Sequence, residues 1–265
     1  MKIIVPIKQV PETSNVRMDP ETGTMIREGV EPIVNPLDLY AIEAAIRLKE
    51  HAGGEIIALT MGPPSARKAL MEAIAMGCDD GILLSNKKFA GADTWSTSYV
   101  LSQAIKKIEK FDLILCGERA TDGDTGQVGP GIAAWLDIPF ATYVSRIQEV
   151  RNGNLYCERM IETGYEELEV QLPCLLTVVK EVNFPRLPTL KGKLRSKAAE
   201  LETWGPADID AQPDFLGLKG SPTRVVKITK PQVARRGKIV APKDEKELMS
   251  AVDGLIEFLK QKEIV

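Results

Sequence analysis

The segment from Asp112 to Pro130 constrains the fold of this chain more than any other part of the sequence. It opens with Asp112 to Cys116, an apolar run of the length and composition of a buried strand. Glycines, threonines and aspartates follow, and an apolar pattern with helical spacing resumes beyond Gln127. A strand, a glycine-rich turn and a helix in this order aim backbone N–H groups and a helix dipole at an anion. We therefore predict a phosphate-binding loop, with an ordinary strand-to-helix loop as the alternative, because glycine-loop motifs give false positives.

Strands alternate with helices through the first half of the chain. The strands are expected at Lys2–Lys8, Glu55–Met61, Gly81–Leu84 and Asp112–Cys116. The helices are expected at Leu37–His51, from Pro64 through Met76 and at Thr94–Lys110. This order predicts an α/β fold with a doubly wound, mostly parallel, Rossmann-like sheet that is covered on both faces.

The pattern changes after Pro139. Residues alternate between polar and apolar at Val144–Val150, Leu155–Ile161 and Glu166–Leu172, with glycine-containing turns between them. Such a pattern predicts an antiparallel add-on at the edge of the sheet. A further buried strand is expected at Cys174–Val179, and a small hairpin is expected within Met18–Gly29.

The C-terminal part is rich in proline and charge and shows little periodicity from Asn183 to Glu245. An amphipathic helix is expected from Glu245 to Lys262. A long stretch without its own core is typical of a linker or of an arm that packs on another chain. We therefore divide the chain into a nucleotide-binding α/β domain, 1–182, and an extended arm, 183–265, with disorder of the arm as the alternative.

Composition excludes several classes of function. The chain has 34 basic and 37 acidic residues, which gives no electrostatic case for nucleic acid. His51 is the only histidine, so a His-based triad or a multi-His metal site is excluded. The chain opens directly on a strand, and no apolar run has the length of a membrane span, so we expect a cytoplasmic protein without membrane insertion.

The four cysteines do not form a metal or disulfide pattern. They are widely separated, with no Cys-x-x-Cys pair, which argues against an iron–sulfur cluster, a structural zinc site or a disulfide framework. Cys116 and Cys174 lie inside apolar runs, where a free cysteine is usually a small core residue. The four cysteines are Cys78, Cys116, Cys157 and Cys174.

Five segments in order resemble the β subunit of electron transfer flavoproteins, and the resemblance covers the whole chain. They are Val5–Pro11, Asn35–Asp38 with Tyr40-Ala41, Met61–Pro63, the loop Cys116–Pro130 and the C-terminal part. The resemblance implies an adenine-nucleotide hydrolase-like fold and a heterodimer. In this family the α subunit carries the electron-transferring FAD on a mobile domain, and the β subunit supplies a nucleotide site and an arm around α.

The resemblance also implies the residues of the nucleotide site. They are Pro6, Asn35, Pro36, Leu37, Asp38, Met61, Gly117, Glu118, Arg119, Ala120, Thr121, Asp122, Gly123, Asp124, Thr125, Gly126, Gln127 and Val128. These positions fit the rule that ligands of open parallel sheets lie beyond the carboxyl ends of the strands. Without the resemblance, Asn35 to Asp38 would be interpreted as helix-initiating residues. The carboxylates Asp122 and Asp124 would repel an anion, so they are expected to point away from it or to cap turns.

The family's β site holds either AMP or a second FAD, and this sequence is more similar to the FAD group. AMP-type members carry bulkier or acidic residues where Gly123, Gly129 and Pro130 stand here. A second indicator is a stretch that resembles the bifurcating group, where it lies beside the flavin and helps to seat NADH. It consists of Gly91, Ala92, Asp93 and Thr94, for which a capped helix start is the alternative. Lys8 is a further candidate for a place near the flavin, or it is simply solvated.

The resemblance then implies a function without catalytic side chains and without a metal. A FAD in the β subunit accepts hydride from NADH and sends one electron to ferredoxin or flavodoxin. The other electron passes through the α-subunit FAD to a flavin-dependent dehydrogenase of the acyl-CoA or lactate type. Leu190 matches the anchor residue of the family's partner-docking loop. The alternative within the family is an AMP-binding structural subunit of a non-bifurcating electron carrier.

Two readings outside the family remain. An ATP-dependent enzyme of the same fold would carry an SGGxDS-like loop after the first strand, whereas this chain has Ile7–Pro11 there. A stress-protein-like ATP-binding module would not explain the long C-terminal arm.

Overall fold

A computed structural model describes residues 1–12, 17–18, 25–26, 32–226 and 239–264. The chain divides into two compact units, Met1–Ile228 and Thr229–Val265. The first unit contains these strands: β1 (Lys2–Pro6), β2 (Gln9–Pro11), β3 (Arg17–Met18), β4 (Met25–Ile26), β5 (Pro32–Val34), β6 (Glu55–Met61), β7 (Asp80–Leu84), β8 (Leu113–Gly117), β9 (Phe140–Arg151), β10 (Asn154–Ile161), β11 (Gly164–Gln171), β12 (Cys174–Val178) and β13 (Glu202–Trp204). Its helices are α1 (Asp38–Ala52), α2 (Arg67–Met76), α3 (Thr94–Ile108), α4 (Val128–Leu136) and α5 (Leu190–Ala198).

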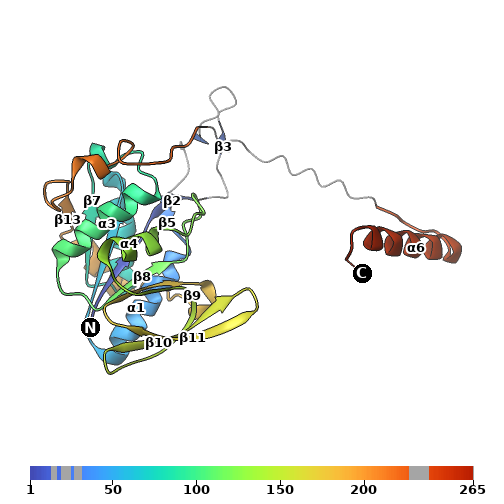
Figure 1. The fold of residues 1–265 in the computed structure, drawn as a ribbon, viewed down its shortest axis with the longest axis horizontal. Coiled ribbons are helices and arrows are strands. Elements are labelled where there is room, and N and C mark those ends of the chain that lie inside the picture. The colour runs from blue at the N-terminus through green and yellow to red at the C-terminus, as the bar shows by residue number, and fades with distance from the viewer. Residues whose placement is uncertain (13–16, 19–24, 27–31, 227–238, 265) are drawn as a thin grey trace. The chain divides into compact units, whose positions relative to one another are not determined.

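The main sheet confirms the predicted doubly wound α/β class. Its nine strands follow the order β11-β10-β9-β12-β8-β1-β6-β7-β13 (Figure 1). Every neighbouring pair from β9 across to β13 is parallel. The chain moves outward from β1 through β6 and β7 on one side, and then returns to place β8 on the other side. The strand order therefore reverses between β1 and β8, which is where such sheets bind ligands.

Each face of the sheet is covered by a pair of helices. The side chains of a strand alternate between the two faces, so apolar residues on both faces are buried under helices. In β1, Ile3 and Val5 face the core that contains α1 and α2. Ile4 faces the opposite core, which contains α3 and α4. The four cysteines are free and buried, which confirms the core position expected for Cys116 and Cys174.

The antiparallel add-on is also present. Strand β10 pairs antiparallel with both β9 and β11, which extends the sheet beyond its parallel part. Strand β9 begins at Phe140, four residues before the predicted start at Val144, because its first residues pair in parallel with β12. Strands β3 and β4 pair antiparallel, as the predicted small hairpin requires, and residues 19–24 between them lie outside the described residues.

The segment after Val182 is not separate from the α/β unit, which extends past the expected boundary to Ile228. Helix α5 packs on α2, and Arg195 Nη2 donates to the carbonyls of Ile74 and Cys78 at 2.6 and 2.7 Å, at the carboxyl end of α2. Strand β13 pairs with β7 and adds the last strand of the sheet. Apolar periodicity gave no sign of this packing, because α5 is held mainly by polar contacts and by the close approach of Gly192 to Ala75 O.

The second unit contains α6 (Glu245–Gln261), which confirms the predicted C-terminal helix. Asp244 caps it by accepting a hydrogen bond from the Glu247 N–H at 2.8 Å. Most of its apolar residues, among them Leu248 and Leu255, are exposed. None of the helices in the described ranges combines the length and the hydrophobicity that a membrane span requires.

Candidate functional site

The structure brings most of the predicted nucleotide-site residues to the switch point of the sheet. Pro6 ends β1 and Gly117 ends β8, and these two strands are neighbours. Residues 35–38 lead into α1 beside them, and the loop 118–127 leads from β8 into α4. This group therefore lies at the carboxyl ends of adjacent parallel strands.

Asn35 ties the start of α1 to the loop. Its side chain is fully buried, and its Nδ2 donates to Asp38 Oδ1 and to the carbonyl of Arg119, both at 2.9 Å. Its Oδ1 accepts from the Thr121 N–H at 3.2 Å. Every polar atom of this side chain is therefore used within the protein, which gives Asn35 a positioning role.

Asp38 continues this network toward β1 and β8. Its Oδ2 accepts from the Lys8 N–H at 2.7 Å. Burial raises the pKa of Asp38 to about 7, although the hydrogen bonds from Lys8 and Asn35 favour the charged form. Gly117 lies against the same carboxyl group, since a Cβ on Gly117 would be 2.5 Å from Asp38 Oδ1. The start of α1 is thus tightly packed against the carboxyl ends of β1 and β8.

The loop presents backbone N–H groups rather than a cationic side-chain cluster. Among the described residues, the N–H groups of residues 125–129 have no hydrogen-bond acceptor. Helix α4 has no side-chain cap, and Gly126 has a φ of +64°, as in the concave turns that bind anions. A Cβ on Gly123 would meet nothing within 4 Å, so the backbone there is open to close approach. The arrangement fits a phosphate group.

The charged side chains of the loop are largely paired, one of them with Lys8 outside the loop. Lys8 Nζ lies 2.6 Å from Asp122 Oδ1, and Arg119 Nε lies 3.2 Å from Asp124 Oδ1. Both carboxylates that were expected to avoid an anion are therefore paired with cations. Lys8, which the sequence left as a candidate near the flavin or as a solvated side chain, is paired here with the loop.

A cavity of about 810 Å³ opens beside the loop. It shares Leu37, Glu118 and Arg119 with the predicted site, and β9 and the end of β10 form another part of its wall. Burial raises the pKa of Glu118 in this wall. Sequence reasoning did not identify the other lining residues, which are Thr142, Tyr143, Arg159, Met160, Ile161, Glu162, Val179, Lys180 and Glu181.

Met61 and the stretch from Gly91 to Thr94 have different surroundings. Met61 ends β6 and packs against the core that contains α3 and α4. Asp93 caps α3 through the Ser96 N–H, and its carboxylate also accepts from the N–H and the hydroxyl of Thr223. Trp95, two residues after Asp93, packs against Trp135 near the carboxyl end of α4, with the two rings tilted by 51° and their centroids 4.7 Å apart. Asp93 thus caps α3, which was the alternative for this stretch, and a place for residues 91–94 beside a nucleotide stays a prediction.

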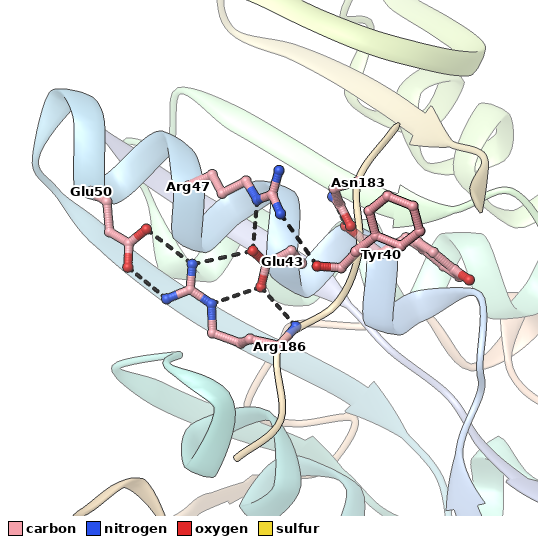
Figure 2. Close-up of polar contacts among 7 residues, drawn as sticks. Tyr40, Glu43, Arg47, Glu50, Asn183 and Arg186 are labelled. Atoms are coloured by element: carbon pink, nitrogen blue, oxygen red, sulfur yellow. Dashed lines mark hydrogen bonds and ion pairs between the residues drawn. The ribbon is translucent and has the colours of Figure 1, made fainter. Parts of the chain in front are cut away.

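Leu190, the predicted docking residue, begins α5 and is 77% exposed. Phe184, Leu187 and Leu194 are exposed as well. The chain that carries them is fixed to α1 by Arg186, which contacts the carboxylates of Glu43 and Glu50 (Figure 2). These four apolar residues, here termed the docking surface, therefore project from an anchored segment.

Replacing Arg186 with leucine should destabilise the first unit by roughly 2 kcal/mol. Breaking a buried ion pair costs about 3–5 kcal/mol, and Arg47 still contacts Glu43 in this variant, at 2.7 Å. The Glu43 side chain is only 2% exposed, which is why the loss should be measurable by chemical denaturation. Arg151→Leu, which removes an exposed pair with Glu149, is the control and should leave the denaturation midpoint nearly unchanged.

The same variant should change the pH dependence of stability. Burial alone would raise the pKa of Glu43, but the hydrogen bonds from Arg186 and Arg47 hold it below its ordinary value of 4.5. A lowered pKa in the folded state stabilises above the unfolded value, and this contribution is lost as the pH falls through the lowered pKa. The difference between the original protein and Arg186→Leu should therefore shrink below pH 4.5. A difference that stays constant in acid would contradict this role of Glu43.

Comparison with known proteins places these observations in one family. Residues 22–209 match the model of the electron transfer flavoprotein domain. The chain is 46% identical to an electron transfer flavoprotein subunit beta of Thermoanaerobacterium thermosaccharolyticum, over 100% of both chains. It is 45% identical to the caffeyl-CoA reductase-Etf complex subunit CarD of Acetobacterium woodii, again over 100% of both. It is 44% identical to protein FixA of Azotobacter vinelandii, over 92% of this chain and 89% of that protein.

Proposed function

The chain belongs to the electron transfer flavoprotein family as a β subunit, and from this premise we propose that its nucleotide site holds FAD. Subunits of this kind pair with an α subunit. We propose further that the pair oxidises NADH and divides the electrons between ferredoxin or flavodoxin and a partner dehydrogenase.

The observation that carries the proposal is the cavity beside the loop. AMP has one phosphate and one ring system, whereas FAD has a pyrophosphate and a second, larger ring system. The unpaired N–H groups of residues 125–129 suit the phosphates, and the open backbone at Gly123 allows their close approach. The cavity of about 810 Å³ shares Glu118 and Arg119 with this loop and is within the size range of cofactor sites. This cavity can hold the second ring system of a dinucleotide, whereas AMP would leave it empty.

The roles of the protein groups follow from this placement. The backbone of the loop would bind the phosphates, and Asn35 with Asp38 would fix the loop to α1. The apolar side chains of Leu37, Met160 and Ile161 would exclude water from the ring system. The bound flavin supplies the hydride and electron chemistry, while the protein sets its distance and orientation. No protein side chain is required as a general acid or base.

One relative favours an association with a reductase, since it is named as a subunit of a caffeyl-CoA reductase-Etf complex. We propose that the docking surface of Phe184, Leu187, Leu190 and Leu194 binds such a flavin-dependent partner, and that the C-terminal helix α6 packs on the α subunit. Exposed apolar residues on an anchored segment are suited to be binding hot spots.

Denaturing the purified αβ heterodimer should release two FAD and no AMP, as measured by mass spectrometry of the supernatant. Addition of NADH under anaerobic conditions should bleach the flavin absorbance. The variant Leu190→Ser lies outside the nucleotide site and should release the same nucleotides, while its binding to the partner dehydrogenase weakens. One FAD with one AMP in the original protein would contradict the FAD proposal and leave a simple electron carrier.

A further inference from the structure

Tyr143 has an unusual backbone conformation within β9. Its φ is 57°, which is rare for a bulky side chain outside turns. The pairing of β9 with β12 shifts at the same place, between Leu176 and Val178, as in a β-bulge. The buried Thr177 holds this conformation, because its Oγ1 accepts from the Tyr143 N–H at 3.1 Å.

The bulge changes the direction of the side chains along β9. Ala141 and Val144 both face the core that contains α1 and α2, although residues three apart in a regular strand face opposite sides. Tyr143 is then free of the core and remains 48% exposed in the wall of the cavity. Strained backbone that re-aims a side chain next to a pocket is a pattern found at functional sites.

The ring of Tyr143 reaches from β9 to the loop. A Cβ on Gly126 would lie 3.7 Å from the Tyr143 hydroxyl oxygen. Among the described residues that hydroxyl has no hydrogen-bond partner, and Thr142 and Glu118 line the same cavity. The aromatic face is therefore available to one part of a ligand and the hydroxyl to another.

We propose that Tyr143 contacts the bound cofactor, with its ring against the planar ring system in the cavity and its hydroxyl toward the phosphate side. This inference rests on the proposed function and adds a residue that selects for a dinucleotide with a second ring system. An aromatic ring provides a large apolar contact area and a preferred stacking geometry. AMP bound only at the loop would leave the ring of Tyr143 without a partner.

The variant Tyr143→Gly separates the ring from the backbone conformation. Glycine adopts a positive φ without strain, so the bulge and the fold should be preserved. Tyr143→Phe keeps the ring and removes only the hydroxyl. Tyr165→Gly, which deletes an exposed ring outside the cavity lining, is the control.

The test uses the αβ heterodimer depleted of flavin and titrated with FAD. For Tyr143→Gly we expect the affinity of the second FAD site to fall about tenfold, the effect of losing one aromatic contact of usual strength. The fluorescence of that FAD should rise, because a stacked tyrosine quenches a flavin. Tyr143→Phe should keep most of the affinity, and Tyr165→Gly should match the original protein in both measurements.

Three results would overturn the inference. If the original heterodimer binds two FAD and Tyr143→Gly retains both with unchanged affinity and fluorescence, Tyr143 does not contact the cofactor. If Tyr143→Gly lowers heterodimer formation in size-exclusion chromatography but not the FAD content per heterodimer, Tyr143 belongs to the subunit interface. If the original protein releases AMP in place of the second FAD, the proposed function itself fails, and that is seen before any variant is made.

Discussion

The αβ heterodimer that carries Asn35→Asp should lose the nucleotide of the β subunit and about 3–4 kcal/mol of stability. An aspartate can still accept from Thr121, but it cannot donate to the carbonyl of Arg119. A carboxylate oxygen would then take the place of Asn35 Nδ2, which lies 2.9 Å from Asp38 Oδ1. Each buried polar group left without a partner costs about 1–3 kcal/mol, and the like charges add to this loss.

This expectation is checked by urea denaturation and by mass spectrometry of the released nucleotides. Asn86→Asp is the matched control, because Asn86 is exposed and an aspartate there can still accept from the Lys88 N–H. The control should stay within about 0.5 kcal/mol of the original protein. Normal nucleotide content and a normal denaturation midpoint in Asn35→Asp would show that the Asn35 network does not hold the loop.

Gly117→Ala should also destabilise the protein, here for a steric reason. Its Cβ would lie 2.5 Å from Asp38 Oδ1 and 2.8 Å from the carbonyl carbon of Leu37. The second contact is with backbone, which cannot move aside without displacing the start of α1. Overpacking of this kind costs about 1–3 kcal/mol, and the displacement should also remove the nucleotide.

Gly123→Ala is the informative companion of this variant. A Cβ at Gly123 meets no protein atom within 4 Å, so the stability of the nucleotide-free protein should not fall. If phosphates approach the backbone there, the affinity for the nucleotide should fall nevertheless. Thermal unfolding with and without added FAD separates the two variants. Gly117→Ala that unfolds at the original temperature with full nucleotide content would contradict the steric argument.

Local patterns predicted most of the fold. The main-sheet strands and the helices of the first half of the chain lie close to where hydrophobic periodicity indicated, whereas the short pair β2 and β5 was not predicted. The order of elements predicted a parallel, doubly wound sheet. These features depend on spacings of two or about four residues, which the sequence displays directly. The structure of the segment after Val182 was harder to predict from local patterns. Its elements α5 and β13 are short and gain their stability from contacts with α2 and β7. Its proposed binding to an α subunit or a dehydrogenase stays a prediction.

The candidate site was predicted only as a set of positions. The resemblance indicated Asn35 and Asp38 as nucleotide-binding residues, and this role stays a prediction. The structure adds that their side chains form hydrogen bonds within the protein. Sequence analysis did not identify Tyr143, because no residue pattern in Pro139–Val144 indicates that β9 bulges there.

By itself the sequence determined the strand–loop–helix unit, the fold class and the family. Only the tertiary structure decided which groups meet. Asn35 reaches Arg119 across 84 residues, and Arg186 reaches Glu43 across 143. Such pairs depend on the order of strands in the sheet, which brings the ends of β1 and β8 together. Hydrogen bonds and packing act over a few ångströms, so their partners are fixed by the three-dimensional position of a residue and not by its place in the chain.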